Sequence, residues 1–286
     1  MYVHDFNCGW MNHPFLSNSM YVNTEEIITK AVDYGIRELY IDTDKGQEVV
    51  DAPTEEEVKK QLQVEIDRIA GQEQEEQELK NRAPISLNEE IAKAKEIKKE
   101  AKKAIHNIME DIRFGKQIKT ETVATVIDEM VDSVFRNQDA LISLGRIKDK
   151  DEYTYMHSVS VGVLMISFGK YLGFDVPILK EVGMGAMLHD VGKMIVSQAI
   201  LKKEDQLTED ELVMMRKHVD YGRMLLEQTK GITDIAITLA SQHHERVDGT
   251  GYPLGLKEDQ ITYYAKAVAI VDVYDAMTSK RCYQDK

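Results

Sequence analysis

The chain has 286 residues, of which 43% are hydrophobic and 30% charged, and its formal net charge is −14. The length allows one large domain or two smaller ones, and the negative charge disfavours broad binding of duplex nucleic acid. Two isolated cysteines, no signal-peptide pattern and no apolar run long enough to span a bilayer indicate a cytoplasmic protein without disulfides.

Residues 1–52 are expected to form a small α/β domain. The segments MYVHDF and ELYIDT have β-type patterns, and TEEIITKAVDYG between them has helical spacing. Thr24 is the predicted N-cap of that helix and Gly35 its predicted stop. His13 precedes a proline in a connecting loop, and we interpret it as a structural histidine.

Residues 53–103 have a different composition. The segment EEEVKKQLQVEIDRIAGQEQEEQELK is rich in Glu, Gln and Lys, which predicts a solvated helix or a partly disordered linker. Ser86 and Glu89 have capping-box spacing and predict the start of a second charged helix. A helical linker of this kind could transmit a signal or dimerise, and the pattern does not distinguish these roles.

Residues 104–286 are expected to form an all-α domain, because no segment there needs to be a strand. The segment YTYMHSVSVGVLMISFGKYLG is apolar nearly all round and predicts a central helix. Further helices are predicted for VPILKEVGMGAMLHDVGK, LTEDELVMMRKHVDYGRMLLEQ, ITDIAITLASQHHE and ITYYAKAVAIVDVYDAMTS. The predicted fold class of the chain is therefore mainly α, with a small α/β domain first.

Side chains of the types that bind metal ions are concentrated in this helical part. Taken singly, each has a simpler explanation: His157 alone would more often be a buried core residue, and His218, beside a lysine, a surface residue. Together they favour a metal site, and imidazole and carboxylate without thiolate suit iron, manganese, zinc or nickel. Asp190 directly follows His189, and its second oxygen could bridge to another ion. The set is His157, His189, Asp190, His218, His243, His244 and Asp272.

Four segments, in order, carry a resemblance to a known family: HDVGK, KHVDYG, HHERVDGTGYP and DVYDAMTSKRCY. Over roughly residues 105–286 the chain resembles the HD-GYP family, the cyclic-di-GMP phosphodiesterases of the HD superfamily of metal-dependent phosphohydrolases. The segment from MYVHDFNCGW to LYIDTDKG resembles, more loosely, a small domain of unknown function that precedes some HD-GYP domains.

The resemblance implies a centre of two divalent ions, iron or manganese, with a bridging hydroxide that attacks phosphorus. The product would be linear pGpG, which some members of the family convert to GMP. The first ion would be bound by His157, His189, Asp190 and Asp272. Asp190 would bridge to a second ion bound by His218, His243 and His244.

The resemblance also implies residues that contact the substrate. Lys193 would contact the scissile phosphate and would act in catalysis together with Asp190. Glu245 could orient an imidazole or be a solvated acid, and Asp248 could bind the ligand or cap its loop. The expected substrate-binding set is Lys193, Asp248, Gly249, Gly251, Tyr252, Pro253 and Arg281.

Three departures from the family pattern modify these expectations. A glutamate that builds a third metal site in some members is replaced by Tyr153, with Glu152 one place away, so two ions are expected. A basic residue common in the family is replaced by Gln284. The family normally continues with more helices after Lys286, which suggests a truncated chain.

Other functions stay open at this point. The chain could bind the dinucleotide without efficient turnover, or it could be an HD phosphohydrolase for another nucleotide. Resemblance also suggests that the GYP loop contacts diguanylate cyclase (GGDEF-type) domains, and a homodimer is possible.

Overall fold

The structure is a computed structural model that describes residues 1–8, 13–47, 49, 52–145, 153–203 and 205–279. It divides into two compact units, Met1–Ile69 and Ala70–Lys286, and each is described by itself.

The first unit contains a small antiparallel sheet and one short helix. The elements are β1 (Tyr2–Asp5), β2 (Met20–Tyr21), α1 (Glu25–Asp33) and β3 (Tyr40–Ile41), and the strand order is β2-β1-β3. Val3 and Phe6 form a small core with Val22, against which Ile27 of α1 packs. His13 is held within its own loop, where its Nε2 lies 2.7 Å from Asn18 Oδ1. The predicted α/β character of this region is confirmed.

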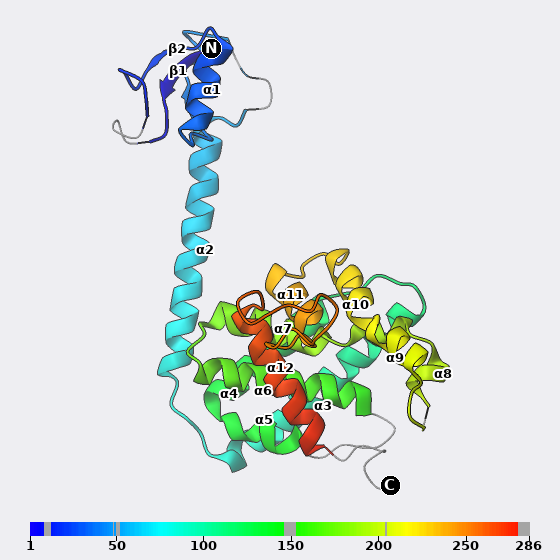
Figure 1. Cartoon of the computed structure of the whole chain (residues 1–286). Coiled ribbons are helices and arrows are strands. Elements are labelled where there is room, and N and C mark those ends of the chain that lie inside the picture. The colour runs from blue at the N-terminus through cyan, green and yellow to red at the C-terminus, as the bar shows by residue number, and fades with distance from the viewer. Residues whose placement is uncertain (9–12, 48, 50–51, 146–152, 204, 280–286) are drawn as a thin grey trace. The chain divides into compact units, whose positions relative to one another are not determined.

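The second unit is helical (Figure 1). Helix α2 (Glu55–Asn81) crosses the division between the units. The elements that follow are α3 (Leu87–Arg113), α4 (Glu121–Arg136), α5 (Gln138–Gly145), α6 (Tyr153–Tyr171), α7 (Val176–Leu188), the 3₁₀ helix η2 (Val191–Ile195), α8 (Gln198–Leu201), α9 (Glu209–Arg216), α10 (His218–Glu227), α11 (Asp234–Gln242) and α12 (Tyr263–Thr278). The prediction of a mainly α chain is confirmed.

Helix α3 differs from the solvated linker that the composition of residues 53–103 suggests. The predicted capping box is present, because Ser86 Oγ accepts from the backbone N–H of Glu89 and the Glu89 side chain accepts from the backbone of Ser86. Ala94, Ile97 and Ala101 are almost fully buried, and α3 packs against α4, α5 and α6. Alanine and isoleucine at helical spacing therefore place this helix in the core of the second unit, although its other faces are charged.

Helix α6 is the predicted central helix. It packs against α7 on one side and α12 on another, and it also contacts α3, α4 and α5. Its Val161, Met165 and Ile166 are fully buried. Helix α11 packs in turn against α7, α10 and α12. Among the described residues, none of the helices combines the length and apolar content that a bilayer span requires.

Candidate metal centre

The structure brings together all seven side chains that the sequence singles out as metal-binding types. They come from α6, from the ends of α7 and α11, from the start of α10 and from α12. They form two groups, within each of which the candidate ligand atoms lie within 4.8 Å of one another. The His157 group contains His157, His189 and Asp272, and the His218 group contains Asp190, His218, His243 and His244.

Three of the imidazoles are oriented in the same way. His189, His218 and His243 each lie just past the end of a helix, α7, α9 or α11. The Nδ1 atom of each lies 2.7–2.8 Å from the carbonyl oxygen three residues earlier, in the last turn of the helix. A carbonyl only accepts, so Nδ1 carries the proton and Nε2 presents a lone pair toward the centre.

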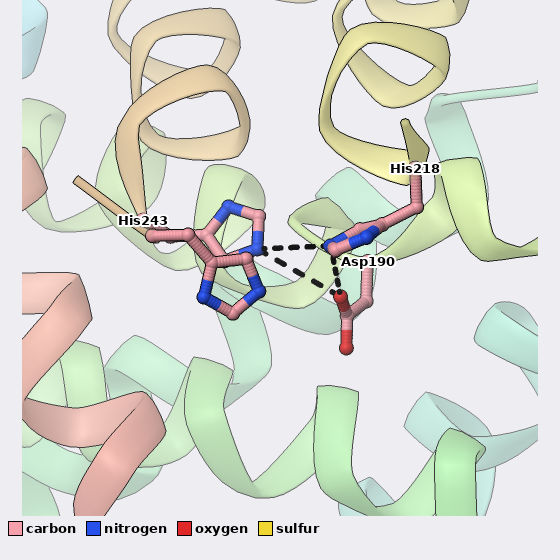
Figure 2. Close-up of side chains that lie close together, drawn as sticks. Asp190, His218 and His243 are labelled. Atoms are coloured by element: carbon pink, nitrogen blue, oxygen red, sulfur yellow. Dashed lines mark hydrogen bonds and ion pairs between the residues drawn. The ribbon is translucent and has the colours of Figure 1, made fainter. Parts of the chain in front are cut away.

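Asp190 lies between the two groups. Its Oδ2 atom is 3.2 Å from His189 Nε2 and 3.8 Å from His157 Nε2. Its Oδ1 atom is 3.4 Å from His218 Nε2 and 3.8 Å from His243 Nε2. Figure 2 shows the convergence of Asp190, His218 and His243 from three different elements. One carboxylate therefore presents a separate oxygen to each group.

Two buried polar atoms at this centre have no hydrogen-bond partner among the described residues. They are His189 Nε2 and Asp190 Oδ1. Each buried polar group without a hydrogen-bond partner lowers the stability of the fold by about 1–3 kcal/mol. In addition, the Nε2 atoms of His218 and His243 lie only 3.5 Å apart. A divalent ion in each group would satisfy these lone pairs, so the donor set fits two such ions.

The pKa values of the histidines differ between the two groups: His243 and His244 are neutral, whereas His189 is protonated when no ion is bound. Burial lowers the pKa of His243 well below its ordinary value and that of His244 to about 4, which keeps both imidazoles neutral. Burial also acts to lower the pKa of His189, but the carboxylate of Asp190 raises it to about 9. Without an ion, His189 therefore holds a proton that metal binding would release.

Lys193 is positioned by the short helix η2. A 3₁₀ helix has three residues per turn, so residues i and i+3 eclipse each other, and Lys193 is three residues after Asp190. Its Nζ atom lies 2.5 Å from Asp190 Oδ2, and its side chain is 26% exposed. The lysine thus places a cation at the solvent side of the shared carboxylate.

The loop from Asp248 to Pro253 covers the side of the His218 group. Tyr252 stacks on His244, with ring centroids 4.7 Å apart, and its backbone N–H donates to the carbonyl of His244. A Cβ on Gly251 would lie 2.4–2.6 Å from the backbone of residues 244–246, so only glycine permits this approach. Gly249 has φ +78°, in the left-handed region that glycine tolerates.

The structure answers the question that the sequence leaves open for Glu245. Glu245 is buried and accepts hydrogen bonds from the backbone N–H groups of Leu254, at 2.7 Å, and Leu256, at 2.9 Å. It neither orients an imidazole nor lies in solvent. Its carboxylate holds the far side of the loop in place.

Asp248 is held within its own loop. It accepts from the backbone N–H and the hydroxyl of Thr250, and these contacts lower its pKa to about 2. The capping role is therefore present, and a ligand contact stays a prediction. Pro253 follows Tyr252 through a cis peptide bond.

Two residues near the centre were missed by the sequence analysis. Asp275 Oδ2 lies 2.7 Å from His157 Nδ1, and the signal for it is its spacing of three residues from Asp272 on one helix. Arg216 lies with its guanidinium carbon 5.2 Å from the centroid of the Tyr252 ring. The expectations for Glu152, Arg281 and Gln284 lie outside the described residues.

Comparisons with known proteins show which families and which fold the chain resembles. The HD domain family matches residues 143–286, and a domain of unknown function (DUF3391) matches residues 1–123. A solved structure described as an HDG"Y"P protein from Bdellovibrio bacteriovorus has a similar fold. Its TM-score is 0.57 at 21% identity, and the match covers 93% of this chain and 79% of that one.

Several curated relatives are named as phosphodiesterases. A cyclic di-GMP phosphodiesterase of Pseudomonas aeruginosa is 44% identical over 159 residues, which are 56% of this chain and 38% of that protein. A cyclic di-GMP phosphodiesterase of Thermotoga maritima is 35% identical over 55% of this chain and 42% of that protein. A 3'3'-cGAMP-specific phosphodiesterase of Vibrio cholerae is 32% identical over 51% of this chain and 33% of that protein. The matches thus span well under half of each relative.

Proposed function

The chain belongs to the HD domain family, and from this premise we propose that it is a metal-dependent phosphodiesterase that hydrolyses cyclic-di-GMP. The observation that carries the proposal is the placement of Asp190, whose two oxygens face two separate groups of imidazoles. The names of the Pseudomonas aeruginosa and Thermotoga maritima relatives support the choice of substrate.

The seven residues of the centre would bind two metal ions. His157, His189 and Asp272 would bind one ion, His218, His243 and His244 would bind the other, and Asp190 would contact both. Two such ions, when bound, lower the pKa of water and neutralise charge on a phosphodiester. We propose iron or manganese, because the set has nitrogen and oxygen donors and no thiolate.

The remaining side chains would bind and orient the dinucleotide. Lys193 lies beside Asp190 at the solvent side, where its charge would stabilise the phosphate as negative charge develops. Tyr252 presents a half-buried ring beside the centre, and the exposed Arg216 adds a guanidinium over that ring. A guanidinium at this position suits a phosphate of the substrate. Arg281 would supply a further phosphate contact.

The proposal extends to the cellular location of the enzyme and to its protein partners. We propose a cytoplasmic enzyme, because two cysteines far apart in the sequence fit a reducing compartment. The exposed tip of the loop at Leu254 could contact a diguanylate cyclase domain, and a homodimer is possible.

The test is hydrolysis by the purified chain, loaded anaerobically with Mn²⁺ or Fe²⁺, of cyclic-di-GMP and 3'3'-cGAMP in parallel. Metal-dependent formation of pGpG that is lost in Asp190→Ala and kept in the exposed control Asp259→Asn would support the proposal. Preferential cleavage of 3'3'-cGAMP would move the assignment to that dinucleotide, which the name of a relative favours. Binding of metal and dinucleotide without cleavage would indicate a sensor.

Lys193 has its own test in the same assay. Lys193→Gln should lower kcat by roughly 100-fold, as for other groups that stabilise developing charge, while metal content is unchanged. The matched control is Lys202→Gln, an exposed lysine nine residues away that makes no ion pair within the described part of the chain. Equal rates for the two variants would remove Lys193 from the mechanism.

A further inference from the structure

His157 is anchored differently from the other oriented imidazoles of the centre. The Nδ1 atoms of His189, His218 and His243 face neutral backbone carbonyls. The Nδ1 atom of His157 instead lies 2.7 Å from a carboxylate oxygen of Asp275. Asp275 is 4% exposed. The two groups of the centre therefore differ in the residues that contact their imidazoles from behind, on the side away from the ion.

The asymmetry also appears in the charges around the two groups. The His157 group contains the carboxylate of Asp272, has Asp275 behind it and faces Oδ2 of Asp190. The His218 group contains one carboxylate, that of Asp190, whose Oδ1 faces its imidazoles. The nearby Glu245 is turned away toward backbone N–H groups. Lys193 offsets part of the charge at Asp190 Oδ2.

A carboxylate behind a histidine has two effects on metal binding. It fixes the tautomer and the orientation of the ring, and it makes the imidazole a stronger donor. It also places an anionic group close to the ion in a buried position, where screening by water is weak. The hydrogen bond acts on the His157 group, because Asp275 contacts His157 across the interface of α6 and α12.

We infer that Asp275 makes the position formed by the His157 group the tighter of the two metal positions. It fills first, and the position formed by the His218 group is the one that loses its ion first. This inference rests on the two-metal centre of the proposed function. It adds that the two ions are unequal and that a side chain outside the ligand set causes the difference.

The experiment is a titration of the metal-free chain with Mn²⁺ alone, followed by calorimetry and by counting bound ions. Two steps of different affinity are expected. In Asp275→Asn the tighter step should weaken by ~10–100-fold, the usual effect of removing such a partner, while the weaker step is unchanged. Asparagine can still accept the hydrogen bond from His157, so the variant removes charge with little change of shape. Asp259→Asn, an exposed aspartate with no ion pair among the described residues, is the matched control.

A second pair of variants keeps the test valid if Asp275→Asn does not fold. His157→Gln should abolish the tighter step, and His218→Gln the weaker step. Two equal steps in the wild type, equal weakening of both steps in Asp275→Asn, or loss of the tighter step in His218→Gln would overturn the inference. No dinucleotide is used, so these results are independent of hydrolysis. A chain that binds no Mn²⁺ would overturn both the inference and the proposed function.

Discussion

A Cβ atom on Gly192 would lie 1.9 Å from the carbonyl oxygen of His218 and 2.4 Å from the backbone nitrogen of Gly222. Helices η2 and α10 therefore touch backbone to backbone at this point. Such contact brings His218 within 3.4 Å of the Asp190 carboxylate, two residues before Gly192. The glycine thus determines how closely the two halves of the metal centre approach.

Replacing this glycine should disturb both folding and metal binding. In Gly192→Ala the methyl group meets backbone, which cannot move aside as a side chain can. We expect a loss of about 3 kcal/mol in the free energy of unfolding. We also expect loss of the ion in the His218 group. Urea denaturation and metal counting measure the two effects.

The matched control is Gly71→Ala, in the middle of α2, where nothing lies within 4 Å of the added Cβ. Alanine has the higher helix propensity, so this variant should gain about 0.5–1 kcal/mol. If Gly192→Ala behaves like this control, the close approach of η2 and α10 does not determine the geometry of the centre.

Removal of metal should lower the thermal stability of the helical unit. An ion that binds only the folded chain stabilises it by ~2.7 kcal/mol when the free ion is 100-fold above its Kd. For a unit of this size that corresponds to a decrease in Tm of roughly 5–10 °C on adding a chelator, restored by Mn²⁺. Differential scanning fluorimetry measures the shift. Asp190→Ala lacks the shared carboxylate and should show no such dependence; an equal shift in that variant would point to binding elsewhere.

The sequence predicts the members of the centre better than the contacts that position them. His157, His189, Asp190 and Asp272 are recognisable because imidazole and carboxylate in short motifs have few structural reasons to recur in one apolar domain. Asp275 carries only the weak signal of its three-residue spacing from Asp272, and its partner His157 is 118 residues away. Only the packing of α6 against α12 brings the two together.

The burial of individual residues is also difficult to predict from the sequence. The composition of α3 is that of a solvated helix, yet Ile97 and Ile105 are almost completely buried. Charged residues dominate the average over the segment, whereas burial depends on the one face that carries alanine and isoleucine. Glu245 illustrates the reverse case, since nothing in its sequence neighbours indicates that its carboxylate binds the backbone of a loop nine residues later.

Glu245 should affect substrate binding without affecting metal binding. Glu245→Gln replaces one of two acceptor oxygens with an NH₂ group that faces a backbone N–H, so the loop loses its attachment. Hydrogen bonds to a charged group contribute about 1.5–3 kcal/mol, and we expect KM to rise by at least roughly tenfold. Steady-state kinetics with metal counting gives the answer. Glu258→Gln, an exposed glutamate two residues after Leu256, is the control. Loss of metal with an unchanged KM would show that Glu245 acts on the centre itself.

A buried ion pair far from the centre supports the packing of α3 against α4. Glu90 and Arg136 form two hydrogen bonds of 2.8 Å, and their side chains are 2% and 11% exposed. Replacing Glu90 leaves the buried Arg136 with only the more exposed Asp132, at 3.4 Å, as an anionic partner among the described residues. Glu90→Gln should therefore lower the free energy of unfolding by about 3 kcal/mol at pH 7. Glu110→Gln, in a pair with Arg113 whose side chains are each 33% exposed, should cost less than about 1 kcal/mol.

The effect of Glu90 should depend on pH in a defined direction. Burial acts to raise the pKa of Glu90, but the hydrogen bonds and charge of Arg136 outweigh it, and the pKa lies below its ordinary value of 4.5. A carboxyl with a lowered pKa in the folded state stabilises fully above its ordinary value and loses that effect as pH falls through the lowered one. Urea denaturation of the wild type and Glu90→Gln from pH 7 down to pH 3 should thus give a constant difference above pH ~5 that shrinks in more acid solution. A difference that stays constant down to the lowest pH would mean that hydrogen-bond geometry, and not the charge of Glu90, stabilises this contact.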